Sequence, residues 1–418
     1  MPEAKLSSAD LLKPPLKRDQ GSTSVSWKDG DGVAVFDGVD GVPGDAEIRA
    51  LLIHVGKDPD DYHWDVAEVN WNSSSWHRTP EVAAKSVKHS AYTAPSCRVK
   101  IKIEQIKNSA FIKETEADIA ALCKIIEKRK PANKSILLND STGRSLLWLW
   151  SDTQAGKGEG GGSTALSNRM GAALQNLLDY LTELEKLGKR PDRIYIVGMG
   201  DLVEQCEGHY PMQAFQVDLD RRQQMKLMRR LLLEAINALV DRGYAIVIAA
   251  VPGNHGENRN SDGKAFTSWT DNDDVAIFEQ VAEVLAANPE RYGNVTVPPG
   301  GLDSEDLVVT LEISGIKCAF AHGHQFKQGA NPTAKAEGWW KGQALGRQRV
   351  SSADILFSGH YHHFASSEGS GRTWFQCPAQ DGGSNWYTYT SGQHSPAGMI
   401  AIGIGTGYAR GWGDLRIV

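Results

Sequence analysis

The stretch Arg193-Ile194-Tyr195-Ile196-Val197-Gly198-Met199-Gly200-Asp201 joins an apolar run, typical of a buried β-strand, to the Gly-Asp pair that ends it. A buried run followed by polar residues occurs at four other places along the chain. The five runs are Leu146–Trp150, Ile194–Val197, Ala245–Val251, Lys317–Ala321 and Ile355–Phe357. Residues delivered from several strand ends converge at one edge of a sheet, where open α/β folds place their sites.

The polar residues that follow these five runs are of the kinds that bind metals. They are Asp152-Thr153-Gln154, Gly200-Asp201, Gly253-Asn254-His255, His322-Gly323-His324 and Gly359-His360-Tyr361-His362. Carboxylates, an amide and imidazoles together suit transition metals such as manganese, iron or zinc. Two such ions about 3.5–4 Å apart can clamp a phosphate and turn a bridging water into the attacking hydroxide. The sequence therefore predicts a two-metal site for a phosphate ester, with Asp201 as the natural bridging carboxylate.

The order and spacing of these stretches resemble the calcineurin-like metallophosphoesterase superfamily, whose signature runs Asp-x-His, Gly-Asp, Gly-Asn-His, His and Gly-His-x-His. The resemblance covers residues 145–405, and four of the five elements are unchanged. It implies an α/β fold, a sandwich of two sheets built from βαβ units and flanked by helices. Longer stretches resemble a narrower group, the actinobacteriophage phosphoesterases related to the SbcD-type double-strand-break repair nuclease. These stretches are Ser151–Lys157, Pro252–His255, Ala321–Gln325, Gly359–His363 and Asp381–Ser384.

The resemblance also implies which residues hold each metal. The first metal would take Asp152, Gln154, Asp201 and His362, and the second would take Asp201, Asn254, His322 and His360. The chain departs from the superfamily at Gln154, where His is usual, and the sequence leaves open whether this glutamine contacts metal. His324 competes with His322 for one ligand position, because residues two apart on a strand face the same way. The resemblance favours His322 as the ligand and places His324 behind it.

His255 is the candidate catalytic acid, because it adjoins Asn254 without being needed as a ligand. An imidazolium at this position can stabilise the pentavalent phosphate and protonate the leaving oxygen. The superfamily usually has Asp or Glu directly after this His, whereas here Gly256 intervenes and Glu257 follows. Either Glu257 reaches back to His255, or His255 is less basic than in relatives. Further candidate substrate contacts combine basic and aromatic groups, and they are Arg259, Trp339, Trp340 and Arg347. Ordinary packing and solvated charge are the alternative for each of them.

The pattern along the chain predicts four parts. Residues 1–24 form a flexible arm, 25–108 an N-terminal α+β accessory module, 109–144 a helical linker and 145–418 the catalytic domain. In the last of these, helices near Thr164–Leu187 and Asp218–Arg242 alternate with strands, which favours a parallel-containing sheet. After Asp306, closely spaced strands with glycine turns predict a second, antiparallel sheet.

Basic residues concentrate ahead of the catalytic domain, where residues 98–134 contain ten Lys or Arg against five Asp or Glu. Within the strand expected at Ser96–Ile106, Arg98, Lys100 and Lys102 alternate with apolar residues and share one face. These three are candidate contacts for nucleic-acid phosphates, and an ordinary solvated face is the alternative. The net charge of −6 gives no nucleic-acid footprint for the chain as a whole.

Cysteine usage and hydropathy bear on the compartment. The five cysteines are scattered and include no Cys-x-x-Cys pair, so a disulfide framework is not expected and a reducing, cytoplasmic setting fits best, the host cytoplasm if the chain is phage-encoded. The stretch Met1–Ser24 is polar and no run approaches 18 apolar residues, which predicts neither export nor a membrane span.

The leading functional interpretation is a two-metal phosphodiesterase that acts on DNA as an endo- or exonuclease. Manganese is the expected metal, with iron or zinc as alternatives, and DNA is the expected partner. The runner-up is a phosphoesterase for a nucleotide or cyclic dinucleotide, which needs a closed pocket and no long basic track. A catalytically silent scaffold is a third interpretation, and the near-complete ligand set argues against it. The sequence does not decide between a homo-oligomer and a separate partner subunit.

Overall fold

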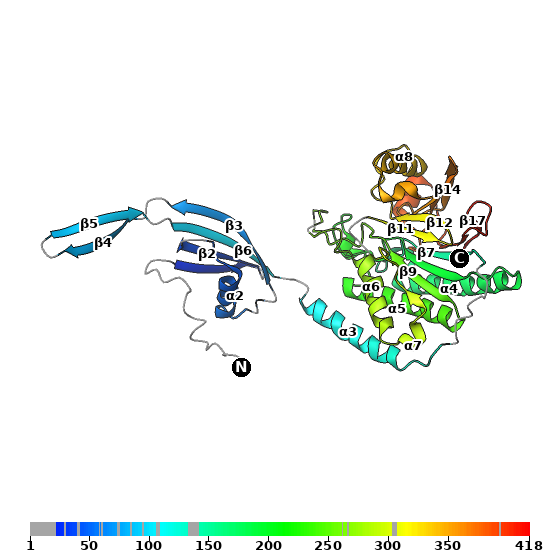
Figure 1. Cartoon of the computed structure of the whole chain (residues 1–418), viewed down its shortest axis with the longest axis horizontal. Coiled ribbons are helices and arrows are strands. Elements are labelled where there is room, and N and C mark those ends of the chain that lie inside the picture. The colour runs from blue at the N-terminus through cyan, green and yellow to red at the C-terminus, as the bar shows by residue number, and fades with distance from the viewer. Residues whose placement is uncertain are drawn as a thin grey trace. The chain divides into compact units, whose positions relative to one another are not determined.

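The computed structural model divides the chain into two compact units, Met1–Glu116 and Ala117–Val418 (Figure 1). The residues that it describes are 22–28, 31–39, 42–57, 59, 62–72, 76–83, 86–93, 96–105, 109–132, 142–260, 262–265, 267–302, 307–392 and 394–418. Of the predicted arm, Ser22–Ser24 form the start of the first strand and the remainder lies outside the described residues. The four-part division of the chain stays a prediction.

The N-terminal unit has the α+β composition expected from its sequence. Its sheet has the strand order β1-β2-β6-β3 with antiparallel neighbours, and β4 pairs with β5 as a separate hairpin. The elements are β1 Ser22–Lys28, β2 Asp31–Val39, α2 Asp45–His54, β3 Tyr62–Asn72, β4 Trp76–Ala83, β5 Ser86–Thr93 and β6 Ser96–Gln105. Val99, Ile101 and Ile103 of β6 are fully buried in one cluster with Ile48 and Leu52 of α2. The alternation in β6 therefore produces one core face and one exposed face.

The second unit contains two sheets. The six-stranded sheet has the order β10-β9-β8-β7-β16-β17, and the five-stranded sheet has the order β11-β12-β13-β15-β14. The strands of the first are β7 Ser145–Trp150, β8 Arg193–Gly198, β9 Ala245–Ala250, β10 Val295–Thr296, β16 Ile400–Ile404 and β17 Trp412–Ile417. Those of the second are β11 Val308–Ile313, β12 Ile316–Ala321, β13 Ile355–Ser358, β14 Ala365–Gly369 and β15 Arg372–Gln376. Strands β7 to β10 run parallel, as the βαβ pattern predicts.

Helices cover the outer faces of both sheets (Figure 1). Helices α5 and α6 contact strands of the six-stranded sheet, and α8 packs against the five-stranded one. The helices are α3 Ser109–Glu127, α4 Gly162–Lys186, α5 Arg221–Asp241, α6 Asp273–Ala286, α7 Pro289–Tyr292, α8 Pro332–Leu345 and α9 Asn385–Ser391. Helix α5 begins at a capping box, in which Asp220 accepts from the Gln223 backbone and the Gln223 side chain accepts from the Asp220 backbone. Among the described residues, no helix combines the length and apolarity needed to cross a membrane.

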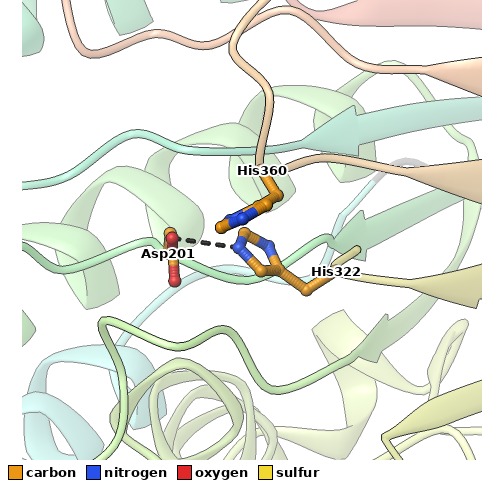
Figure 2. Close-up of side chains that lie close together, drawn as sticks. All are labelled: Asp201, His322 and His360. Carbon is orange, nitrogen blue, oxygen red and sulfur yellow. Dashed lines mark ion pairs between the residues drawn. The ribbon is translucent and has the colours of Figure 1, made fainter. Parts of the chain in front are cut away.

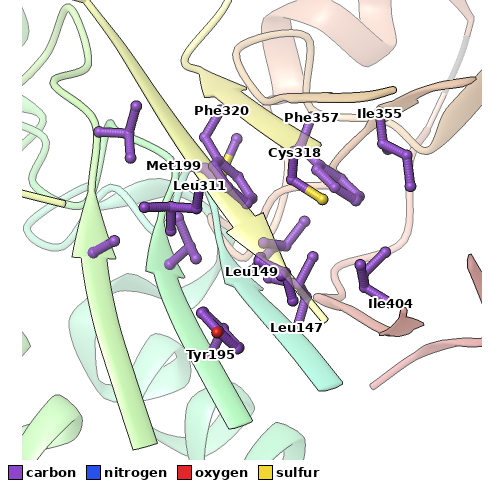
Figure 3. Packing of buried hydrophobic residues seen from close by; sticks show 14 of the residues in the cluster. Leu147, Leu149, Tyr195, Met199, Leu311, Cys318, Phe320, Ile355, Phe357 and Ile404 are labelled. Atoms are coloured by element: carbon purple, nitrogen blue, oxygen red, sulfur yellow. The ribbon is translucent and has the colours of Figure 1, made fainter. Parts of the chain in front are cut away.

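The main core lies between the two sheets (Figure 3). Leu147 and Leu149 of β7 face Phe320 of β12 and Phe357 of β13 within one cluster of buried side chains. The alternate residues of β7, such as Trp148, are fully buried as well. A strand whose two faces are both covered reads as a continuous apolar run, which is why these strands are recognisable in the sequence. The predicted sandwich of two sheets flanked by helices is therefore confirmed.

The second sheet differs from the prediction of a purely antiparallel one. Strands β12, β13 and β15 are mutually parallel, and the antiparallel pairs are β11–β12 and β14–β15 at the two edges. Parallel neighbours need a crossover connection, and helix α8 supplies the one between β12 and β13. Glycine turns in the sequence mark the hairpins at the edges but do not show which strands pair in the middle.

Candidate metal centre

The five metal-ligand stretches meet at the carboxyl ends of five strands. Strands β7, β8 and β9 are parallel neighbours in one sheet, and β12 and β13 are parallel neighbours in the other. Backbone hydrogen bonds then tie the loops together. The N–H of Asp152 donates to the Gly200 carbonyl at 3.1 Å, and the N–H of Gly359 donates to the His322 carbonyl at 2.8 Å. The fold therefore holds these loops side by side before any ligand binds.

Three predicted ligands form one compact cluster, Asp201, His322 and His360, whose ligand atoms all lie within 4.8 Å of one another (Figure 2). Nε2 of His322 is 3.0 Å from Oδ2 of Asp201, and both side chains are buried. Asn254 lies beside this cluster, since the N–H of the next residue, His255, donates to Oδ1 of Asp201 at 2.7 Å. Oδ1 of Asn254 is buried and has no hydrogen-bond partner within the described part of the chain. A buried amide oxygen without a partner suits a cation, so this donor set fits a divalent metal.

Burial and charge interactions inside this cluster shift the pKa values of Asp201, His322 and His360. Burial lowers the pKa of His322, but the charge of Asp201 outweighs it and raises that pKa to about 9. Burial alone would raise the pKa of Asp201, but His322 and His255 hold it well below its usual range. Burial and the charge of His322 lower the pKa of His360 to about 4. The cluster therefore contains one carboxylate that stays ionised in the folded protein.

The other predicted set centres on Asp152 and His362, with Nε2 of His362 3.2 Å from Oδ1 of Asp152. Nδ1 of His362 lies 3.2 Å from Oδ2 of Asp381, a carboxylate–imidazole contact of the kind that orients metal-bound histidines. Burial would raise the pKa of Asp381, but His362 and Lys157 keep it well below the usual range. The role of Asp381 was not predicted, although its stretch is among those that carry the narrower resemblance.

Gln154 faces Lys157, whose ammonium group donates to Oε1 of Gln154 at 3.1 Å and also binds Asp381. The amide oxygen that would contact the first metal therefore already has a donor. Metal contact by Gln154 stays a prediction, and of the two predicted ligand sets the one with Asp152 and His362 is the weaker.

The backbone at the predicted ligands is strained. Five of the seven have positive φ angles, which residues other than glycine rarely adopt. They are Asp152 at 50°, Gln154 at 44°, Asp201 at 53°, His360 at 72° and His362 at 57°. Each such residue costs roughly 1–3 kcal/mol, and clusters of them mark functional sites. The hydrogen bonds between the loops stabilise this conformation.

Asp274 at the start of α6 is a second residue whose importance was not predicted. It is fully buried and accepts hydrogen bonds from the backbone N–H groups of Asp201, Leu202 and Gly253 at 2.8, 2.8 and 3.0 Å. Burial and the charge of Asp201 raise the pKa of Asp274 to about 7. Its partners lie up to 73 residues away in sequence. No local signal other than its position near a helix start could have identified it.

The ring of His255 contacts the segment of residues 204–210. Nδ1 of His255 is 3.0 Å from the Glu204 carbonyl oxygen and 3.5 Å from Oε2 of Glu204. His209 stacks on the ring with centroids 4.0 Å apart and planes inclined by 6°. Glu257, one of the two alternatives left open by the sequence, binds Arg259 at 2.8 Å. The carboxylate that faces His255 belongs to Glu204.

The candidate substrate contacts from the α8 region mostly serve packing. Trp340 is only 8% exposed and donates through Nε1 to the Val350 carbonyl at 3.1 Å, so it is a core residue and is not available to stack on a base. Trp339 packs on Phe326 with centroids 4.6 Å apart. Arg347 is exposed after the end of α8.

His324 lies behind the cluster, with its ring centroid 5.5 Å from that of His322 and 6.4 Å from that of His360. Burial and the charge of His322 lower the pKa of His324 to about 3. Its Nδ1 is buried and has no hydrogen-bond partner in the described structure. The ranking of His322 ahead of His324 as the ligand stays a prediction.

A pocket of about 980 Å³ opens beside these residues. Its walls come from the loops after β7, β8, β9, β13 and β15. The lining residues are Gln154, Lys157, Glu159, Glu204, Tyr210, Pro211, Gln216, His255, Pro332, His360, Tyr361, His362, His363, Asp381, Gly383, Ser384, Thr388, His394 and Ser395. The pocket therefore joins the candidate acid His255 to candidate ligands of both metals.

The basic strand of the N-terminal unit has acidic neighbours that its sequence does not reveal. Arg98, Lys100 and Lys102 are exposed, as predicted. In the sheet, however, Arg98 pairs with Asp37 of β2, Lys100 pairs with Glu68 of β3, and Lys102 pairs with Asp65 of β3. Directly paired residues share a face and lie within reach of one another. The three cations are therefore interleaved with three acids, which weakens this face as a phosphate-binding track.

No family model and no curated protein matches the chain. Among solved structures, a predicted phosphoesterase from Streptococcus pneumoniae TIGR4 is similar at 13% identity, covering 62% of this chain and 83% of that one, with a TM-score of 0.26. Vacuolar Protein Sorting 29 from Cryptosporidium parvum is 14% identical over 66% and 97% of the two chains, with a TM-score of 0.30. A novel archaeal phosphodiesterase is 11% identical over 65% and 99%, with a TM-score of 0.28. The function therefore has to be inferred from the residues of the site.

Proposed function

We propose that this chain is a metal-dependent phosphodiesterase. The observation that carries the proposal is the buried carboxylate of Asp201 with the imidazoles of His322 and His360 around it, at the wall of a pocket of about 980 Å³. The unpartnered amide oxygen of Asn254 adds a neutral ligand. A neutral ligand completes the site without adding negative charge that would repel a phosphate.

The residues divide into two ligand sets that share Asp201. Asn254, His322 and His360 would hold one divalent ion together with Asp201, and Asp152, Gln154 and His362 would hold the other. When bound, the ions supply Lewis acidity, which neutralises charge on a phosphate and makes water a better nucleophile at neutral pH. Manganese is the first metal to test, with iron and zinc as alternatives, because carboxylate, amide and imidazole ligands suit all three.

The chain's own residues supply orientation and a proton. His255 lines the pocket without belonging to either ligand set, so it can give a proton to the oxygen that leaves phosphorus. Lys157 lines the same pocket, although Gln154 and Asp381 already bind its ammonium group. Asp274 holds the Asp201 and Asn254 loops together through three backbone hydrogen bonds. These contacts set the geometry before substrate arrives, which is the main contribution of a protein to phosphoryl transfer.

DNA is the first substrate that we propose, and its support is the basic strand β6 together with the nuclease resemblance of the motif stretches. A nucleotide or cyclic dinucleotide is the second, and two observations favour it. The pocket volume lies at the upper end of the range for small-molecule sites. In addition, Asp37, Asp65 and Glu68 interleave with the cations of β6. Single-stranded DNA whose end enters the pocket is compatible both with the support for DNA and with the support for a small substrate.

The proposed activity is tested by hydrolysis assays with manganese, iron and zinc. The substrates are bis(p-nitrophenyl) phosphate, a cyclic dinucleotide, a short single strand, a short duplex and supercoiled plasmid. We expect metal-dependent hydrolysis of the bis-ester and of at least one nucleotide substrate, abolished by a chelator and restored by metal. Chelator-insensitive turnover, or no turnover on any substrate by protein that binds metal, would contradict the proposal.

Reversing the charges of Arg98, Lys100 and Lys102 tests the DNA substrate separately. If this face contacts phosphates, changing all three to Glu should weaken DNA binding and lower the slope of log affinity against log salt by roughly one unit per lost contact. Hydrolysis of the bis-ester should not change, because so small a substrate contacts only the metal centre. Fluorescence anisotropy of labelled DNA over a salt series provides the measurement.

The acids that pair with these cations provide a matched control. The double variant Asp65→Asn/Glu68→Gln should move DNA affinity in the opposite direction, because it removes negative charge from the same face. Equal DNA affinity of the parent protein at low and high salt would end the proposal of DNA binding by this module and leave the small phosphodiester as the substrate.

A further inference from the structure

The candidate acid His255 is held by one short segment, residues 204–210, which follows the metal-ligand stretch Gly200-Asp201. The carbonyl and the carboxylate of Glu204 both face Nδ1 of His255, at 3.0 and 3.5 Å. His209 covers one face of the ring in a parallel stack. Since Nδ1 faces this segment and His255 lines the pocket, the opposite nitrogen, Nε2, is the one left for substrate.

Glu204 has an unusual environment for an acidic side chain. It is only 1% exposed, and the Tyr210 hydroxyl donates to Oε1 at 2.7 Å. Oε2 is buried and has no hydrogen-bond partner within the described residues. A buried carboxylate oxygen without a donor is destabilising, because it has lost its hydration without gaining a hydrogen bond. A structural role alone gives no reason to keep such a group beside a histidine in a pocket.

We infer that Glu204 is a positioning residue for His255: its backbone carbonyl accepts from Nδ1–H at 3.0 Å and its carboxylate faces the same nitrogen at 3.5 Å, which directs Nε2–H at the oxygen that leaves phosphorus. This inference rests on the proposed phosphodiesterase function. A carboxylate that orients an imidazole through Nδ1 is a device used by many hydrolases. Here it comes from the segment after β8, three residues beyond Asp201, and not from the residues that follow His255.

The other carboxylate close to His255 in the sequence is that of Glu257, and its own contacts keep it from binding His255. Glu257 is two residues away, but both Nε and Nη2 of Arg259 donate to its Oε2, at 2.9 and 2.8 Å. Glu204, in contrast, has one oxygen held by Tyr210 and the other facing His255. Gln213 also donates to the Glu204 carbonyl at 2.8 Å, which fixes the backbone of the segment.

The step in which this geometry matters is the departure of the leaving group. The oxygen of water forms a bond to phosphorus while the bond between phosphorus and the leaving oxygen breaks, and the leaving oxygen takes the proton from Nε2 of His255. The neutral imidazole then regains a proton from solvent, into which the attacking water has released one, so the net reaction adds water across the ester. A leaving group that is stable as an anion needs this proton little, whereas an alkoxide needs it greatly.

The test compares two leaving groups in Glu204→Gln, a change that keeps the size of the side chain and removes its charge. For a dinucleotide, whose leaving group is an alkoxide, kcat should fall on the order of 10–100-fold, part of the full contribution of a proton donor. For bis(p-nitrophenyl) phosphate, kcat should fall less than about threefold. Metal content, measured by elemental analysis, should be unchanged. Glu207→Gln, an exposed acid on the same segment, is the matched control and should change neither rate.

A double-mutant cycle shows whether Glu204 acts through His255. In a His255→Asn background, adding Glu204→Gln should change kcat for the dinucleotide by less than about twofold. If Glu204→Gln does not fold, as judged by circular dichroism, Glu204→Asp replaces it, since the shorter side chain withdraws the carboxylate from Nδ1 of His255 and should show the same dependence on leaving group.

The possible outcomes distinguish a failure of the Glu204 assignment from a failure of the proposed phosphodiesterase function. A parent protein that hydrolyses no ester with any metal contradicts the proposed phosphodiesterase itself. An active parent in which Glu204→Gln slows both leaving groups equally, or still slows the reaction after His255 is replaced, overturns only the assignment of Glu204. Loss of metal in Glu204→Gln overturns it as well, because Glu204 would then act on the ligands.

Discussion

Asp201→Asn should leave a folded protein that neither retains two metals nor hydrolyses phosphodiesters at a detectable rate. Asp201 is the carboxylate that the two proposed ligand sets share, and it pairs with His322 at 3.0 Å. An amide has no charge to hold two cations, so both sites should weaken together. Elemental analysis after loading with manganese should find close to two ions per chain in the parent and fewer than one in the variant.

The fold should survive this change, because the Asp201 backbone is what anchors the loop. Its N–H donates to Asp274, and this hydrogen bond does not involve the side chain that is replaced. Circular dichroism and thermal melting in the presence of chelator should therefore give similar curves for parent and variant. Asp179→Asn, an exposed change on α4, is the matched control and should keep both metals. Full activity in Asp201→Asn would contradict the two-metal assignment.

His255→Asn should differ in kind from the ligand variant: both metals stay bound, while kcat for a nucleotide substrate falls on the order of 10²–10⁴-fold. The metal centre should be preserved because His255 contacts Asp201 through its backbone N–H, which asparagine also has. The side chain, in contrast, is the proposed proton donor, and asparagine cannot replace it. Paired measurements of metal content and steady-state kinetics distinguish the two effects.

A second pocket-lining histidine makes the comparison specific. His363 lines the same pocket without contacting either ligand cluster through any interaction found among the described residues, so His363→Asn should alter kcat by less than about tenfold. If His255→Asn lost metal along with activity, His255 would be a ligand. His324, which lies beside His322 and has an unpartnered buried nitrogen, would then be the next candidate for the acid.

Local patterns in this sequence were enough to locate most of the regular structure. The helices expected at Thr164–Leu187 and Asp218–Arg242 occur as α4 Gly162–Lys186 and α5 Arg221–Asp241. These boundaries agree closely because amphipathic periodicity and capping residues act over one or two turns of chain. The central strands are equally recognisable, because a strand buried on both faces needs an unbroken apolar run.

The contacts made by the site residues could not be predicted from the sequence, because they join segments that are far apart in the chain. Asp274 holds the Asp201 loop from 73 residues away, Glu204 faces His255 from 51 residues away, and Asp381 contacts His362 across two strands. From the sequence alone, an Asp that accepts hydrogen bonds from buried backbone N–H groups cannot be distinguished from an Asp on the surface. The burial of Trp340 against the second sheet likewise follows from the placement of α8, which the sequence does not show.

The sequence by itself determined the order of strands and helices, the candidate metal ligands and the exposed basic face of β6, because these follow from residue chemistry and from periods of two and 3.6 residues. Only the tertiary structure decided which strands of the second sheet run parallel, which carboxylate attends His255, and that Asp37, Asp65 and Glu68 interleave with the cations of β6. Strand pairing and side-chain contact are relations between segments that are far apart in the chain. Their free energy depends on how the whole core packs, and no short window of sequence contains that information.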